Sequence, residues 1–159
     1  MSFRHDLVVV GLGSGGIVAA EFAATLGLRV AAVERARPGG DCLWTGCVPS
    51  KALIASARVA HHMRTADRYG IGAVEPEVDT TDVWRRIRTI QEGIAATDDS
   101  PERISALGVE LVSGEARVTG PHTVAAGGRV LDTRYILLAT GSRPAIPPVE
   151  GLGEAGFLT

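Results

Sequence analysis

Two cysteines, Cys42 and Cys47, are the residues of this 159-residue chain whose type and spacing most directly indicate chemistry. They stand in a glycine-rich stretch that is followed by Pro49, Ser50 and Lys51. A helix entering at Pro49 points the positive end of its dipole at Cys47, and Lys51 adds a positive charge. Both favour a thiolate over a thiol, as a redox-active cysteine requires. The pair therefore indicates reversible thiol chemistry.

The spacing of the cysteines constrains how they could pair. Residues five positions apart in a regular helix have Cα atoms about 8–9 Å apart, whereas a disulfide needs less than about 7 Å. A bond between Cys42 and Cys47 therefore requires a distorted turn, which Gly46 can supply. Two other interpretations remain open. One is a zinc site completed by His61 and His62, and the other is a pair of inert core cysteines.

A glycine turn near the N-terminus indicates a nucleotide. Gly11, Gly13 and Gly16 fit the pattern G-x-G-x-x-G directly after an apolar run. The first glycine permits a tight turn, the second lets the backbone approach a pyrophosphate, and the third lets helix and strand pack closely. The helix that follows presents free N–H groups to the phosphates. The alternative is a glycine-rich turn in another α/β fold.

An acidic residue stands at the expected distance from this turn. Glu34 lies 18 residues after Gly16, at the end of the second predicted strand. Its carboxylate can accept hydrogen bonds from a ribose diol, and its charge disfavours a 2′-phosphate. This favours FAD or NAD. Arg35 follows directly, where it could lie along an adenine ring or be solvated.

The apolar pattern places these residues on a strand–helix–strand unit. Strands are predicted over 6–11 and 28–34, with a helix over 14–26 between them. Residues 35–50 are predicted to be irregular. Further helices are predicted over 49–68, 81–97 and 100–108. Strands are predicted over 109–118, 122–125, 129–131 and 135–139, the last one buried. The proline-rich stretch 143–151 is predicted to be extended.

The composition excludes several classes of protein. A net charge of −2 gives no electrostatic footprint for nucleic acid or for an anionic membrane. Apolar residues make up 45% of the chain, which favours a folded domain. No apolar run approaches the roughly 20 residues of a membrane span. Two cysteines are too few for a disulfide-rich scaffold. We expect a cytoplasmic location, where cysteines are more often catalytic than structural.

These motifs together resemble one family. Cys-x4-Cys-x-Pro-Ser-Lys after Gly39-Gly40, combined with the N-terminal glycine turn, is similar to the class I pyridine nucleotide–disulfide oxidoreductases. The stretches Gly114–Ala116 and Ala139–Pro144 extend the likeness over essentially the whole chain. The family includes dihydrolipoamide dehydrogenase, glutathione reductase and mercuric reductase, and the likeness favours the first and the last of these.

The resemblance implies a fold and a place in a larger protein. The expected fold is α/β, a Rossmann-like FAD-binding fold of the glutathione-reductase type. It would contain a parallel sheet, helices and a small antiparallel β-meander. Residues 1–150 would form the N-terminal part of an FAD-binding domain. Residues 151–159 would start a linker toward an NAD(P)-binding domain that the chain lacks. The parent protein would be a homodimer.

The resemblance also implies roles for individual residues. Electrons would pass from NAD(P)H through FAD to a Cys42–Cys47 disulfide, and on to a small-molecule disulfide or a soft metal ion. Cys47 would lie against the flavin as a charge-transfer thiolate, Cys42 would attack the substrate, and Lys51 would stabilise the reduced flavin. No resident metal is expected. The implied FAD-binding residues are Gly11, Gly13, Ser14, Gly15, Gly16, Glu34, Arg35, Gly40, Asp41, Gly46, Ala116, Ala139, Thr140 and Gly141.

Two residues depart from the family pattern, and other functions remain open. Asp41 stands where threonine is common, and Trp44 where asparagine is common. A carboxylate beside a pyrophosphate is repelled unless it points away or is paired. We expect this chain alone to bind FAD weakly or not at all and to be inactive. The alternatives are a non-catalytic flavin-binding module and a dithiol protein that works without flavin.

Overall fold

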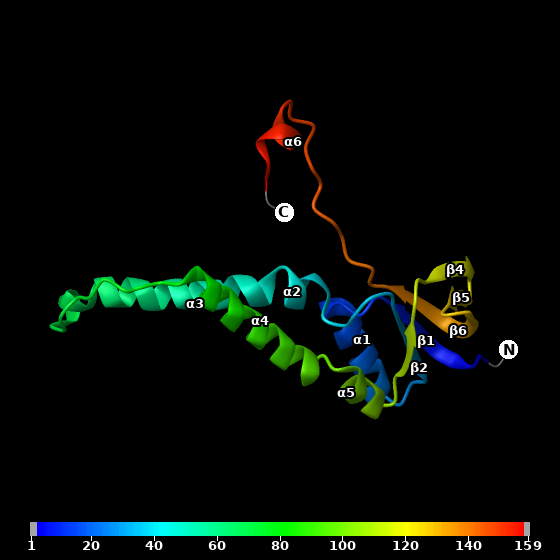
Figure 1. Ribbon diagram of the computed structural model, residues 1–159. Coiled ribbons are helices and arrows are strands. Elements are labelled where there is room, and N and C mark those ends of the chain that lie inside the picture. Colours follow the sequence, from blue (N-terminus) through cyan, green and yellow to red (C-terminus); the bar gives the residue numbers. More distant parts are fainter. Residues whose placement is uncertain (1–2, 158–159) are drawn as a thin grey trace.

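The strand–turn–helix–strand unit predicted at the N-terminus organises the fold. The computed structural model describes residues 3–157 (Figure 1). The strands are β1 (His5–Val10), β2 (Val30–Glu34), β3 (Glu110–Ser113), β4 (Arg117–Gly120), β5 (Thr123–Ala126) and β6 (Arg129–Leu138). The helices are α1 (Ser14–Thr25), α2 (Gly40–Trp44), α3 (Cys47–Arg64), the 3₁₀ helix η1 (Ala66–Tyr69), α4 (Thr80–Ala96), α5 (Pro101–Ala106) and α6 (Leu152–Ala155).

The six strands form one sheet in the order β3-β2-β1-β6-β5-β4. β3, β2, β1 and β6 run parallel. β5 and β4 continue the sheet as an antiparallel meander that shares β6. This arrangement confirms the predicted α/β class, with a parallel sheet, helices and a small meander. The carboxyl ends of β1, β2 and β6 therefore meet at one edge, where ligands bind in open α/β sheets.

The two faces of the sheet carry two apolar cores. Successive side chains of a strand point to opposite faces, so Val9 belongs to one core and its neighbours Val8 and Val10 to the other. The first core also contains residues of α1 and α5, namely Ile17, Ala20, Ala23 and Ile104. The second also contains residues of the meander, namely Val124, Ala126 and Leu131. The β1–α1–β2 unit is thus fixed from both sides.

Helices α3 and α4 project from this body as an arm (Figure 1). The arm joins the body at its near end, where α2 leads into α3 and α4 leads toward α5. Asp79 caps α4 by accepting a hydrogen bond of 2.7 Å from the backbone N–H of Thr81. Ser100 and Pro101 begin α5 as predicted, and the Ser100 hydroxyl accepts from the backbone N–H of Arg103. Within the described residues, no helix is both long and apolar enough to cross a membrane.

Several predicted elements differ in detail. The irregular segment 35–50 contains α2, and α3 begins at Cys47 rather than at residue 49. Pro49 falls within the first turn of α3, where backbone N–H groups have no intrahelical partner, so the helix can begin before it. The strand predicted over 109–118 is split into β3 and β4. The strands predicted over 129–131 and 135–139 are one, β6.

The predicted burial of residues 135–139 is wrong. Tyr135 is 60% exposed and Leu138 is 65% exposed. β5 pairs with β6 only as far as Asp132, and beyond that point the described residues place a strand, β1, on one side of β6 alone. After β6 the chain leads away from the sheet through the proline-rich stretch to α6 (Figure 1). That stretch has no helix or strand up to residue 149, as predicted.

Candidate functional site

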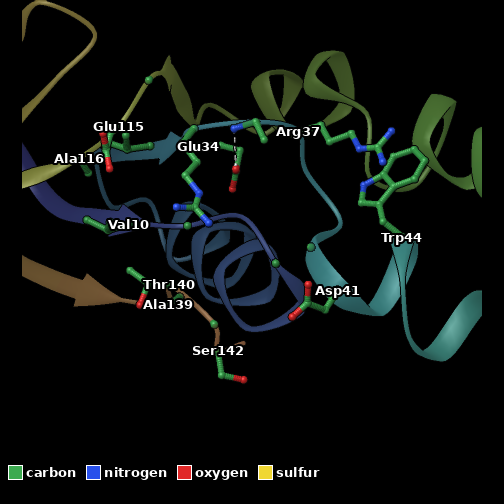
Figure 2. Close-up of a pocket in the computed structure, with 18 of the residues that line it drawn as sticks. Val10, Glu34, Arg37, Asp41, Trp44, Glu115, Ala116, Ala139, Thr140 and Ser142 are labelled. Atoms are coloured by element: carbon green, nitrogen blue, oxygen red, sulfur yellow. Dashed lines mark hydrogen bonds between the residues drawn. The ribbon is translucent and has the colours of Figure 1, made fainter. Parts of the chain in front are cut away.

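A cleft of about 540 Å³ lies at the edge where β1, β2 and β6 end (Figure 2). Gly11 and Gly13 of the glycine turn line it, together with Glu34 after β2 and Thr140 after β6. In Figure 2, Glu115 and Ala116 lie toward one end of the cleft and Asp41 toward the other. The cleft is long, open to solvent, and bordered by backbone at several points. These features suit an extended, polar ligand such as a dinucleotide.

The glycine turn needs its glycines for close packing. Gly11 has φ 96°, and a Cβ there would collide with the carbonyl oxygen of Ala139. A Cβ on Gly16 would collide with the carbonyl oxygen of Gly11. α1 begins directly after Gly13, and its first intrahelical bond comes from the N–H of Ile17. The N–H groups of the first turn before Ile17 are therefore available to an anion.

The Glu34 carboxylate is fixed in a position where it can accept hydrogen bonds from a diol. One carboxylate oxygen accepts a hydrogen bond of 2.8 Å from the backbone N–H of Leu12, and the other accepts one of 2.9 Å from the backbone N–H of Ala36. These bonds fix the carboxylate at the end of β2 and leave further lone pairs on each oxygen. Ribose hydroxyls are donors that match such an acceptor.

The cysteine segment is attached directly to the glycine turn. The backbone N–H of Gly39 donates a hydrogen bond of 2.9 Å to the carbonyl of Leu12, and Gly39 forms a β-bridge with Gly13. A Cβ on Gly40 would lie 2.7 Å from the Cα of Gly13. The cleft and the start of α2, which carries Cys42, are therefore parts of one site.

The two cysteines lie on either side of a break between helices. α2 ends at Trp44 and α3 begins at Cys47. At the break, the backbone N–H of Gly46 donates a hydrogen bond of 2.6 Å to the carbonyl of Asp41. A Cβ on Gly46 would lie 3.1 Å from that oxygen, so the turn favours glycine. The break supplies the distortion that the spacing of the cysteines requires. Both cysteines are free thiols in this structure.

The thiols interact, and their environments differ. A hydrogen bond with the Cys47 thiol lowers the pKa of Cys42, and a hydrogen bond with the Ser14 hydroxyl lowers it further. The charge of Lys51 also lowers the pKa of Cys42, while burial and the carboxylate of Asp99 oppose the shift. The hydrogen bond with Cys42 raises the pKa of Cys47. Cys42 is half-buried and Cys47 is exposed.

A buried glutamine on α4 supports the helix that carries Cys42. Gln91 is 8% exposed, and its amide donates hydrogen bonds of 2.9 Å to the carbonyls of both Leu43 and Trp44. These carbonyls are in the last turn of α2, where no intrahelical donor reaches them. Gln91 is a supporting residue of the site that was not predicted from the sequence. Its position on the apolar face of α4, four residues after Ile87 and three before Ile94, was the available signal.

Trp44 is fixed at the same end of the cleft. Its indole N–H donates a hydrogen bond of 2.8 Å to the carbonyl of Pro38, and the guanidinium carbon of Arg37 lies 3.4 Å from the ring centroid. Figure 2 shows Arg37 stacked over Trp44. The ring is therefore held against Arg37, and both residues line the cleft.

The cleft brings together ten of the residues predicted to bind FAD. These are Gly11, Gly13, Glu34, Arg35, Gly40, Asp41, Ala116, Ala139, Thr140 and Gly141. The remaining predicted site residues adjoin the cleft on α1, α2, α3 and the break, without lining it. These are Ser14, Gly15, Gly16, Cys42, Gly46, Cys47 and Lys51. Lining residues that the sequence analysis did not name as binding residues include Arg37, Trp44, Glu115, Ser142 and Arg143.

The zinc interpretation does not fit the structure. His61 and His62 lie in the last turn of α3, whereas Cys47 is its first residue. At 1.5 Å per residue they are about 20 Å from Cys47 along the helix. They cannot complete a site with the cysteines. Residues 3–157 contain no group of three or more His, Cys, Asp or Glu side chains that could hold a metal ion.

Known proteins have similar sequences over most of this chain. It is 38% identical over 151 residues to a dihydrolipoyl dehydrogenase of Thermus scotoductus, covering 92% of this chain and 31% of that protein. It is 36% identical to a glutathione reductase of Burkholderia cepacia (94% and 33% covered). It is 35% identical to a mercuric reductase of Streptomyces lividans (98% and 34% covered). The chain spans about a third of the length of these relatives.

A solved structure shows the same fold. The Cu(II) complex of the HOCl-induced flavoprotein disulfide reductase RclA from Escherichia coli superposes with a TM-score of 0.73 at 21% identity, over 94% of this chain and 31% of that one. The family model described as pyridine nucleotide-disulphide oxidoreductase matches residues 5–159. The glycine turn, the fixed Glu34 and the thiol pair all fall within this match. The chain therefore belongs to the pyridine nucleotide-disulphide oxidoreductase family.

Proposed function

We propose that residues 1–150 are the N-terminal part of the FAD-binding domain of a flavoprotein disulfide reductase. Cys42 and Cys47 would alternate between two thiols and a disulfide. The proposal depends on one observation. The backbone N–H of Gly39 donates a hydrogen bond to the carbonyl of Leu12, and Gly39 forms a β-bridge with Gly13. This contact attaches the segment that carries the thiols to the glycine turn of the cleft, which supports the proposal. Residues 151–159 would begin the linker toward an NAD(P)-binding domain.

The residues at the cleft fit FAD. The first turn of α1 would hold the pyrophosphate with its free N–H groups, and Glu34 would accept hydrogen bonds from the adenosine ribose. The backbone of Ala116 would meet the adenine, and Thr140 and Gly141 would close over the ligand. The packing of Gly40 on Gly13 leaves no side chain between the backbone and the phosphates. When bound, FAD supplies a two-electron carrier between NAD(P)H and sulfur.

The thiol pair would carry out the exchange with substrate. One thiolate attacks a substrate disulfide, its sulfur forms a mixed disulfide, and one substrate thiol leaves. The second cysteine then attacks this bond, which releases the other substrate thiol and forms the Cys42–Cys47 disulfide. Two electrons leave the protein in this half-reaction. Lys51 favours the thiolates by its charge. Soft metal ions also bind thiolates, so they are a second substrate class.

The family members named above support these substrate classes, because they include a glutathione reductase and a mercuric reductase. In the parent protein, NAD(P)H would be the electron donor. We also propose that the parent is a cytoplasmic homodimer.

A thiol count tests the redox pair. The air-oxidised chain, once denatured, should show no reactive thiol, and the same chain treated with a reductant should show two. The Cys47→Ser variant is the control, since it cannot form an internal disulfide and should show one thiol in both states when kept monomeric. Two free thiols in the oxidised chain would contradict the proposal. A flavin absorption spectrum after incubation with FAD distinguishes a flavoprotein from a dithiol protein that works without flavin.

A further inference from the structure

Asp41 lies at the end of the cleft where the proposed FAD site would hold its phosphate groups. It follows Gly40, which packs on Gly13 at the start of α1. Asp41 and Gly13 both line the cleft. Figure 2 shows Asp41 away from the end occupied by Glu115 and Ala116. A pyrophosphate bound at the first turn of α1 would therefore have the Asp41 carboxylate as a neighbour.

Arginines line the same cleft, namely Arg35, Arg37 and Arg143, but none of them forms an ion pair with this carboxylate. Its side chain is exposed, and within residues 3–157 it takes part in no ion pair or hydrogen bond. Its neighbour Arg37 is stacked on Trp44. The other acid near the turn, Glu34, differs because both of its oxygens already accept backbone N–H groups. Asp41 is thus a free negative charge beside an anion site.

We propose that Asp41 is a specificity-determining residue that weakens the binding of dinucleotides through charge repulsion with their pyrophosphate. This inference rests on the proposed FAD site. Two like charges near a protein surface repel by an amount equivalent to a roughly five- to thirtyfold change in affinity. The repulsion acts on phosphate-bearing ligands and spares a neutral ligand in the adenosine part of the cleft. The site would therefore bind phosphate-bearing ligands less tightly than its glycine turn predicts, while its affinity for neutral ligands would be unaffected.

The test measures the affinity of FAD and of adenosine for the wild-type chain and for Asp41→Asn and Asp41→Ala. NMR titration is suitable because weak binding is expected. Both variants should bind FAD about five- to thirtyfold more tightly, and adenosine should bind all three proteins equally. Asp67→Asn is the control, because it removes the same charge from η1, beyond the far end of α3 and more than about 25 Å from the cleft. It should leave both affinities unchanged.

Salt provides an independent readout. The ratio between variant and wild-type affinity should shrink as the Debye length falls from about 30 Å at 0.01 M salt to about 3 Å at 1 M. Unchanged FAD affinity in both variants would overturn the role of Asp41 and leave the FAD site intact. If only Asp41→Asn binds FAD more tightly, the role of Asp41 is also overturned, because the new amide would then be the cause. If the variants also bind adenosine more tightly by the same factor, the effect does not involve the phosphates, and the role of Asp41 is overturned. If no variant binds FAD, the inference about Asp41 is wrong, whereas the proposed place of this chain within a larger FAD-binding domain stands, since the chain alone is expected to bind FAD weakly or not at all.

Discussion

Replacing Gln91 by methionine should loosen the helix that carries Cys42. Methionine preserves the volume and the apolar packing of the side chain but removes two hydrogen bonds of 2.9 Å to the carbonyls of Leu43 and Trp44. A typical internal hydrogen bond contributes about 0.5–1.5 kcal/mol net. The two together give an expected loss of about 1–3 kcal/mol in the free energy of unfolding. For a chain of this size, this lowers Tm by roughly 2–12 °C.

Urea unfolding followed by circular dichroism measures this loss, with the m-value shared between variants. The matched control is Glu92→Met, which places the same side chain at the adjacent, exposed position of α4. The free energy of unfolding of this control should lie within about 0.5 kcal/mol of the wild-type value. In the native state, the thiol of Cys42 should also react faster with an aromatic disulfide in Gln91→Met, because α2 opens more often. A Gln91→Met variant as stable as the control would refute the role assigned to this glutamine.

Two further predictions concern the glycine turn and the thiols. Gly16→Ala should destabilise the fold by about 1–3 kcal/mol or more, because the new methyl collides with the carbonyl of Gly11. Gly15→Ala meets nothing within 4 Å and should be neutral or stabilising, so equal urea midpoints for the two variants would contradict the packing argument. In Cys47→Ala the hydrogen bond that lowers the pKa of Cys42 is lost, so that pKa rises. Since the thiolate is the reactive form, alkylation of Cys42 by iodoacetamide should then begin at higher pH than in Cys47→Ser, whose hydroxyl can still donate. An identical pH profile for the two variants would contradict the assigned hydrogen bond.

Much of the fold could be predicted because it depends on local chemistry. The apolar strand before Gly11, the glycine pattern and the acid at Glu34 are close in sequence, and each has one physical role in a strand–turn–helix unit. Ser100 and Pro101 likewise indicate a helix start by themselves. The boundaries of α2 and α3 could not be predicted in this way. They depend on the break at Gly46, which a backbone contact to Asp41 stabilises.

The amino-acid sequence by itself indicated the family, the cleft-lining glycines and the candidate cysteine pair, because these follow from residue type and spacing. Only the tertiary structure decided which distant groups act on them. It placed Gln91 against the last turn of α2, fixed Glu34 on two backbone N–H groups, and left the Asp41 side chain, among the described residues, without an ion pair in the cleft. It also left the end of β6 exposed, although its composition predicts burial. The reason is the same in each case. Burial, charge compensation and hydrogen-bond partners are set by elements far apart in the chain, and periodicity along one segment carries no information about them.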